Sequence, residues 1–161
     1  MPERPGIVLD TGIVLQAVLR PAGPAGRLVS LVDRGLFCVY LSDACVSEYR
    51  DVLRRPAVRA KNPYLTDELA EAVVTAICGS AVLVPDPLDH SFRLRDPNNE
   101  HIVNLAVTAN ADYIVSRDND LLDLVHDGAF IGRFPRLRVV DPVAFLHEMN
   151  AQNPRDSEPP T

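Results

Sequence analysis

Short apolar runs rich in Val, Leu and Ile alternate with longer runs of helical periodicity along most of this 161-residue chain. The short runs read GIVLD, LFCVYLS, AVLVP, DYIVS and LRVVD and span residues 6–10, 36–42, 81–85, 112–116 and 137–141. The helical runs cover residues 12–20, 25–35, 42–55, 65–79, 96–111, 118–125 and 142–150. Strands that alternate with helices form parallel sheets covered on both faces. The pattern therefore predicts a three-layer α/β fold with a central parallel sheet of about five strands flanked by helices.

One domain is expected over residues 1–150, because the chain is long enough for one hydrophobic core and shows no internal repeat. The tail at 151–161, AQNPRDSEPPT, is polar and rich in proline, which predicts disorder. No apolar run approaches the roughly 18 residues of a membrane span, and the N-terminus lacks a signal-peptide pattern. Cys38, Cys45 and Cys78 lie in apolar runs, which predicts reduced core thiols in a cytoplasmic protein.

The formal net charge of −6 argues against a protein that coats nucleic acid, because such a protein needs a basic face. A negative net charge is nevertheless compatible with an enzyme that binds a phosphate backbone at one site through metal ions. In the segment RDVLRRPAVRAK, Arg50, Arg54 and Arg55 are candidates for positioning that backbone, although such a run also suits a solvated helix face. Neither the cysteines nor the histidines have the spacing of a metal site.

The tripeptide Asp10-Thr11-Gly12 has two interpretations. Aspartic proteases carry their catalytic carboxylate in this sequence, but a buried parallel strand can also end in an acid that begins a helix. The residues after Gly12 have helical periodicity, and no second such tripeptide follows. These features favour the strand end. A phosphatase of the haloacid dehalogenase type is also disfavoured, because it needs Asp-x-Asp and position 12 is glycine.

Four acidic residues lie where a parallel sheet places its functional groups. Asp10 ends the first strand, and Asp118 follows the strand at 112–116. Sites in open parallel sheets form at the carboxyl ends of strands, so these two carboxylates meet if their strands are neighbours. Glu48 borders the apolar stripe of its helix, and Glu100 lies in the first turn of another helix on its inward side.

Each acid also has a purely structural interpretation. Asp10, Asp96 and Asp118 suit helix N-caps, Glu48 suits a solvated helix border, and Glu100 suits the positive end of a helix dipole. Taken as a set, however, clustered carboxylates repel one another and need a counter-charge. Hard oxygen ligands without a well-placed histidine or cysteine favour Mg²⁺ or Mn²⁺.

Four segments in this order resemble the PIN domain over about residues 6–146. They are V-L-D-T, S-x-x-x-x-S-E-Y-R-x-V-L-R-R-P, D-P-x-x-E and A-D-Y-I-V-S-R-D-x-D-L-L. The resemblance is closest to toxin components of bacterial and archaeal toxin–antitoxin systems that are related to VapC ribonucleases. It implies a metal-dependent endoribonuclease built on a central parallel sheet.

The resemblance also implies roles for particular residues. The implied ligands of Mg²⁺ or Mn²⁺ are Asp10, Glu48, Glu100 and Asp118, with Asp96 as an additional ligand and Thr11, Ser116 and Asp120 as neighbours that orient the ligands. The implied partners are an RNA substrate, a cognate antitoxin protein and a second copy of the chain. The apolar composition of the helices at 24–34 and 65–79 suits such an interface.

Three departures from the family pattern affect the expected activity. Gly12 replaces an asparagine that relatives often carry, and Glu100 replaces an aspartate. Asn98 and Asn99 stand where relatives often have further acids. A catalytically weak or inactive PIN-fold module that acts through protein contacts is therefore the alternative function.

Overall fold

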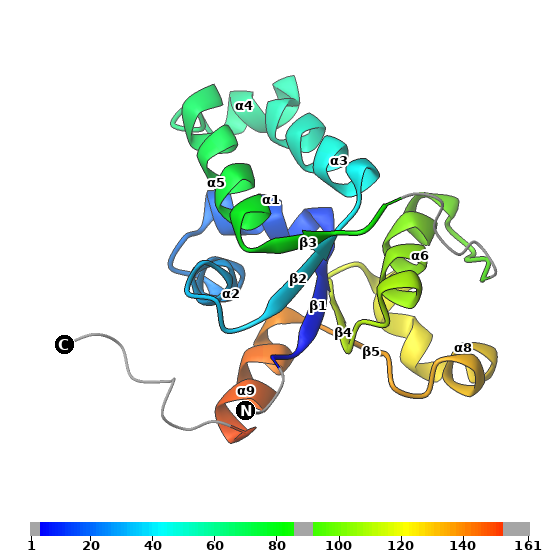
Figure 1. The fold of residues 1–161 in the computed structure, drawn as a ribbon. Helices are drawn as coiled ribbons and strands as arrows, with labels where there is room; N and C mark the ends of the chain where they lie inside the picture. The colour runs from blue at the N-terminus through cyan, green and yellow to red at the C-terminus, as the bar shows by residue number, and fades with distance from the viewer. Residues whose placement is uncertain (1–3, 86–91, 153–161) are drawn as a thin grey trace.

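The computed structural model describes residues 4–85 and 92–152, and its strands form one five-stranded parallel sheet (Figure 1). The order across the sheet is β3-β2-β1-β4-β5. The strands are β1 (Gly6–Leu9), β2 (Cys38–Leu41), β3 (Ala81–Leu83), β4 (Tyr113–Val115) and β5 (Arg138–Val140). This architecture confirms the predicted fold class. The strand order reverses between β1 and β4, and a functional crevice is expected at the carboxyl ends of these two strands.

The central strand β1 is entirely buried. Ile7 pairs with Val39 of β2 on one side and with Tyr113 of β4 on the other. A parallel strand covered on both faces needs apolar residues at every position, which explains why GIVL does not alternate with polar residues.

Helices cover both faces of the sheet. They are α1 (Thr11–Leu19), α2 (Pro24–Asp33), α3 (Asp43–Arg54), α4 (Pro56–Lys61), α5 (Asp67–Gly79), α6 (Glu100–Ala109), α7 (Asn119–Leu122), α8 (Gly128–Arg133) and α9 (Pro142–Gln152), with short 3₁₀ turns η1 (Pro97–Asn99) and η2 (Asp123–His126). Helix α6 packs against β1, β2 and β4, whereas α1 and α2 lie on the other side of these strands (Figure 1). Helix α3 contacts both α1 and α6, which places it over the carboxyl ends of the central strands. Among the helices of the described residues, none combines the length and the apolar character that crossing a bilayer requires.

A side chain or a glycine determines several of the helix ends. The Ser42 hydroxyl accepts a hydrogen bond from the Cys45 N–H at 3.2 Å and begins α3. The Thr66 hydroxyl accepts from the Leu69 N–H at 3.1 Å and begins α5. Gly35 follows α2 with a φ of +78°, a conformation that favours glycine.

Helices α4 and α8 were not predicted from the sequence pattern. Pro56 follows the end of α3 and begins α4, because proline suits the first helical turn. Asp127 begins α8 by accepting hydrogen bonds from the N–H groups of Ala129 and Phe130. The chain before Glu100 forms η1 rather than α-helix, with Asp96 as its N-cap.

Two further expectations need correction. Cys78 is exposed rather than a core thiol, because the buried residues of α5 are Ala70, Val74 and Ile77 and Cys78 lies beside that stripe. Cys45 is buried, Cys38 is partly buried, and all three cysteines are free. Helix α9 continues to Gln152, past the expected start of the tail, and the predicted disorder of 153–161 falls outside the described residues.

Candidate functional site

Asp10 lies where β1 ends and α1 begins. Its N–H still donates to the carbonyl of Val115 at 3.0 Å, so the backbone remains attached to β4 at this point. One carboxylate oxygen, Oδ1, accepts from the Thr11 N–H at 2.8 Å and caps α1. The structural interpretation of Asp10 as a cap is therefore correct, and it leaves the second oxygen free to face β4.

Ser116 connects Asp10 to Asp118. Its hydroxyl donates to Oδ2 of Asp10 at 2.7 Å and accepts from the N–H of Asp118 at 3.0 Å. Asp118 in turn caps α7, because its Oδ1 accepts from the Asp120 N–H at 2.8 Å. Two acids from the ends of neighbouring strands are thus joined through one buried hydroxyl.

Burial raises the pKa of Asp10 above its ordinary value. Hydrogen bonds from Ser116 and Thr11 oppose this rise, while the negative charges of Asp118 and Glu48 add to it. The fold therefore brings three carboxylates, from β1, α3 and the end of β4, within electrostatic range of one another.

Glu48 faces a histidine that the sequence did not indicate. Its Oε2 lies 2.5 Å from Nε2 of His101 on α6. A hydrogen bond to the sulfur of Cys45 and the negative charge of Glu48 raise the pKa of His101 to about 9, although burial opposes the shift. At neutral pH a positive imidazolium therefore accompanies the Glu48 carboxylate. No spacing rule connects positions 48 and 101, so only helix packing reveals this pair.

Tyr49 holds α3 against the end of β1. Its side chain is fully buried, and its hydroxyl donates to the carbonyl of Leu9 at 2.5 Å. Leu9 immediately precedes Asp10, and Glu48 immediately precedes Tyr49. This hydrogen bond therefore fixes the position of Glu48 relative to Asp10.

Glu100 and Asp96 are engaged in the segment before α6. Oε1 of Glu100 accepts from the Leu94 N–H at 3.1 Å, and Oδ1 of Asp96 accepts from the Asn98 N–H at 3.0 Å. Neither contributes to the raised pKa of Asp10. Residues 4–85 and 92–152 contain no group of three or more His, Cys, Asp or Glu side chains arranged to hold a metal ion.

The predicted arginines lie on exposed surface. Arg50 pairs with Glu71 of α5 at 2.9 Å, and Arg55 pairs with Asp51 at 3.5 Å. Arg54 is exposed in the last turn of α3. Exposed ion pairs stabilise a fold weakly, so these arginines can exchange their partners for phosphate at little cost.

Residues 6–120 match the sequence model of the PIN domain. This chain belongs to the PIN domain family. The matched stretch contains all four of the acids that the sequence pattern indicated, Asp10, Glu48, Glu100 and Asp118. PIN domains are generally nucleases.

Two known proteins are similar to this PIN domain protein over most of its length. The uncharacterized protein MJ1680 of Methanocaldococcus jannaschii is 23% identical over 143 residues, which cover 88% of this chain and 90% of the relative. The crystal structure of VapBC2 from Rickettsia felis, bound to a DNA fragment from their promoter, aligns with a TM-score of 0.53 at 13% identity. That alignment covers 84% of this chain and 98% of the other. The structural likeness shows that the two proteins share a fold.

Three features of this candidate site suit a hard divalent cation. Asp10 and Asp118 present carboxylates without a cationic side chain between them, because the bridging group is the neutral hydroxyl of Ser116. The Thr11 hydroxyl beside Asp10 is buried and has no hydrogen-bond partner in the described residues. A Cβ placed at Gly12 would contact only Oδ2 of Asp10, at 4.0 Å, so the space next to this carboxylate is open.

Proposed function

We propose that this PIN domain protein is a metal-dependent endoribonuclease, the toxin of a toxin–antitoxin pair, which hydrolyses RNA phosphodiester bonds. The observation that carries the proposal is the hydrogen-bonded chain from Asp10 through Ser116 to Asp118 at the reversal of strand order. Two acids that serve only as helix caps need no shared hydroxyl. Their arrangement suits a site that concentrates negative charge for a cation.

Asp10, Asp118 and Glu48 would hold Mg²⁺ or Mn²⁺. A bound divalent ion lowers the pKa of a water molecule and stabilises charge on the scissile phosphate. Ser116 fixes the orientation of Asp10, and the free hydroxyl of Thr11 offers a further oxygen beside it. Glu48 would leave its contact with His101 to hold the ion.

Glu100 would ligate a second ion or orient the attacking water, and Asp96 would supply an additional ligand. Both roles require these carboxylates to leave their present contacts with the backbone N–H groups of Leu94 and Asn98. Asp120 caps no helix itself and pairs with Arg95 at 3.0 Å, so it would act by orienting the segment that carries Asp118. Arg50, Arg54 and Arg55 would contact the RNA backbone on the side of α3.

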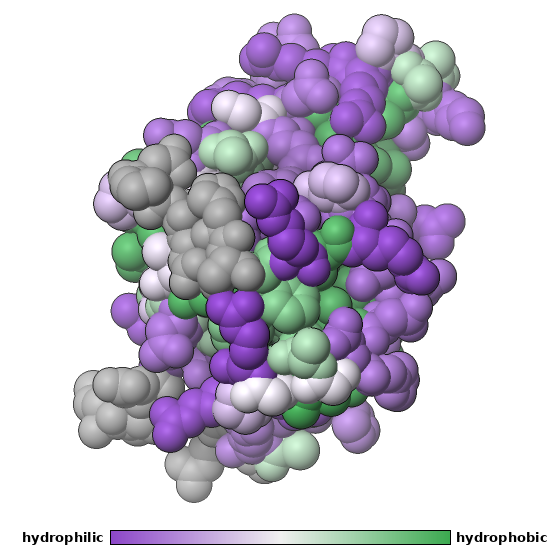
Figure 2. Space-filling model, turned by 90° about the vertical axis from the view of Figure 1, so that its right-hand side faces the viewer, coloured by the Kyte–Doolittle hydropathy of each residue, from purple (hydrophilic) through white to green (hydrophobic). Residues whose placement is uncertain are grey.

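The protein partners would be a second copy of this chain and an antitoxin. An apolar groove of about 520 Å³ lies between α1, α2 and α5, with Val18, Val29, Val73 and Ala76 among its lining residues. On the face that carries α6 and α8, hydrophilic residues surround a central apolar area (Figure 2). We assign the groove to the homodimer, because α2 and α5 carry the excess of apolar residues. The antitoxin would reach the acidic site with an arginine or lysine that replaces the cation.

A protein of this kind belongs in the cytoplasm, where reducing conditions keep Cys38, Cys45 and Cys78 free. Its substrate is present in the same compartment.

Incubation of the purified protein with a mixed RNA pool tests the activity. Cleavage products are expected with Mn²⁺, and none with EDTA or with the Asp10→Asn variant. A wild-type protein that neither cleaves RNA nor binds Mn²⁺ by calorimetry would instead support the inactive protein-binding module. The contact of Glu48 with His101 is the specific observation that favours this second function, because it already neutralises one of the carboxylates.

A further inference from the structure

The contact between Glu48 and His101 joins a candidate cation ligand to a basic side chain. Oε2 of Glu48 on α3 lies 2.5 Å from Nε2 of His101 on α6. Both atoms are buried, and neither has any other hydrogen-bond partner within residues 4–85 and 92–152. One of the two oxygens that Glu48 could offer to a cation is therefore covered by the imidazole.

Glu48 differs in this respect from the other two carboxylates of the site. Oδ2 of Asp10 accepts from the Ser116 hydroxyl at 2.7 Å. Oδ1 of Asp118 accepts from the Asp120 N–H at 2.8 Å. These donors are neutral, so they orient the two aspartates without supplying a positive charge in place of the cation. Of these three acids, only Glu48 contacts a basic side chain among the described residues.

Packing holds Glu48 and His101 beside each other. Helix α6 packs against β1, β2 and β4, and the Tyr49 hydroxyl ties α3 to the carbonyl of Leu9. His101 also has a hydrogen bond to the sulfur of Cys45, which is fully buried. The side chains of Glu48 and His101 are nevertheless 36% and 23% exposed. A rotation of the Glu48 side chain, without movement of either helix, would therefore open the contact.

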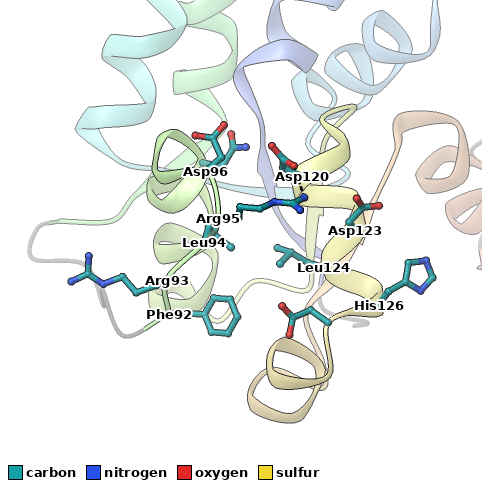
Figure 3. A pocket seen from close by; sticks show the side chains of 11 residues that line it. Phe92, Arg93, Leu94, Arg95, Asp96, Asp120, Asp123, Leu124 and His126 are labelled. Carbon is teal, nitrogen blue, oxygen red and sulfur yellow. Dashed lines mark hydrogen bonds and ion pairs between the residues drawn. The ribbon is translucent and has the colours of Figure 1, made fainter.

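A second ion pair near the site is much more exposed. Arg95 pairs with Asp120 at 3.0 Å beside a cavity of about 320 Å³, between the segment that precedes α6 and helix α7 (Figure 3). The Arg95 side chain is 82% exposed, so water and salt weaken its charge interactions. Charges that are shielded from water interact more strongly. His101, rather than Arg95, is therefore the basic side chain that can oppose a cation at this site.

We propose that His101 is a positioning residue that holds Glu48 away from the divalent cation and thereby limits the cation affinity of the free protein. The apparent affinity of a ligand falls with the fraction of the protein that is competent to bind it. A hydrogen bond to a charged group that must first be broken corresponds to about a tenfold to hundredfold loss of affinity. The inference rests on the proposed function, because it takes the cation and the role of Glu48 from that site.

Calorimetric titration with Mn²⁺ tests the proposal without RNA. His101→Ala removes the basic side chain and should bind Mn²⁺ at least about tenfold more tightly than the wild type. Arg95→Ala is the matched control, because it removes a positive charge beside Asp120 but no contact of Glu48. Its affinity should stay within about twofold of the wild type. Unchanged affinity in His101→Ala would overturn the proposal, and so would weaker affinity, which would make His101 a support of the cation site.

A double-mutant cycle shows whether His101 acts through Glu48. The gain in Mn²⁺ affinity from His101→Ala should disappear in the Glu48→Gln background, because glutamine cannot form the charged contact. A gain that persists in this background, or an equal gain in Arg95→Ala, would show a general effect of charge and overturn the proposal.

NMR on the wild-type protein gives an independent measurement if His101→Ala does not fold. Mg²⁺, which is diamagnetic, is titrated into the protein while the imidazole signals of His101 are followed. The backbone signals of Asp10 and Asp118 report the binding itself. Mg²⁺ should shift the imidazole signals over the same concentration range, because Glu48 leaves the imidazole. Shifts at Asp10 and Asp118 without any shift at His101 would overturn the proposal.

RNA cleavage separates this inference from the proposed ribonuclease. Tighter Mn²⁺ binding by His101→Ala, together with cleavage by the wild type, supports both. Tighter binding by a protein that leaves RNA uncut supports the role of His101 and removes the ribonuclease. Equal binding by wild type and variant, with RNA cleaved, overturns the role of His101 and leaves the ribonuclease intact. If neither protein binds Mn²⁺, both proposals are overturned.

Discussion

The Ser116 hydroxyl lies 2.7 Å from Oδ2 of Asp10, although the two residues are 106 positions apart in sequence. The contact forms because β1 and β4 are neighbours and both strands end at the same edge of the sheet. The same hydroxyl accepts the Asp118 N–H, so one small side chain orients two acids. The predictions below test this arrangement first.

Replacement of Ser116 by alanine should destabilise the protein by about 1–3 kcal/mol, because it leaves the partly buried Asp118 N–H and one oxygen of Asp10 without a partner. Urea unfolding in the absence of metal measures the change. Ser47→Ala, on the exposed face of α3, is the control and should have almost no effect. A loss below about 0.5 kcal/mol for Ser116→Ala would mean that the hydroxyl contributes nothing to the site.

Asp10→Asn should leave the metal-free protein equally stable or more stable at neutral pH. The folded pKa of Asp10 is raised, so the folded state binds the proton more tightly than the unfolded state. Ionisation of Asp10 therefore lowers the free energy of unfolding as the pH rises from 3.8 through the folded pKa. This loss of stability persists at pH 7. Asparagine removes that charge. A fall in melting temperature of more than about 3 °C would show that capping of α1 outweighs the repulsion.

His101 should make the metal-free protein less stable at alkaline pH. Its pKa is raised from 6.5 to about 9 in the folded state, so its contribution is fully present below pH 6.5 and is lost as the pH rises through 9. The expected loss is on the order of 1–3 kcal/mol, measured by urea unfolding at both ends of this window. The stability of the His101→Gln variant should depend less on pH over the same window. An imidazole that titrates by NMR at its ordinary pKa would contradict the charged pair with Glu48.

Mn²⁺ should raise the melting temperature of the wild-type protein, because an ion that binds only the folded state stabilises it by mass action. At a free Mn²⁺ concentration 100 times its dissociation constant, the free energy of unfolding increases by about 2.7 kcal/mol. The shift should disappear in Asp10→Asn and shrink in Asp118→Asn. Shifts of equal size in all three proteins would place the ion away from these two carboxylates.

Ala72→Glu should convert the proposed homodimer to a monomer, because Ala72 is exposed and lines the apolar groove between α1, α2 and α5. Size-exclusion chromatography with light scattering measures the mass. Ala44→Glu on the exposed side of α3 is the matched control and should remain dimeric. A wild-type protein that is strictly monomeric at tens of micromolar would refute the dimer.

Local sequence signals were sufficient for most of the architecture. Buried parallel strands need continuous apolar residues and helices need periodic ones, so both appear in the sequence without reference to the rest of the chain. The caps at Ser42 and Thr66 were predictable for the same reason, because a side chain that bonds an N–H a few residues on depends on local geometry alone. Helix α4 was missed because proline suits both the end of one helix and the start of the next.

By itself the sequence determined the α/β fold, the resemblance to PIN domains and the positions of Asp10 and Asp118 at strand ends. Only the tertiary structure decided which groups meet those acids. The contacts of Asp10 with Ser116 and of Glu48 with His101 join residues that are distant in sequence. The burial of Asn99 without a partner likewise depends on the segments that close around it. Such pairings follow from strand order and from the packing of α3 against α6, and no local pattern of residues encodes these long-range contacts.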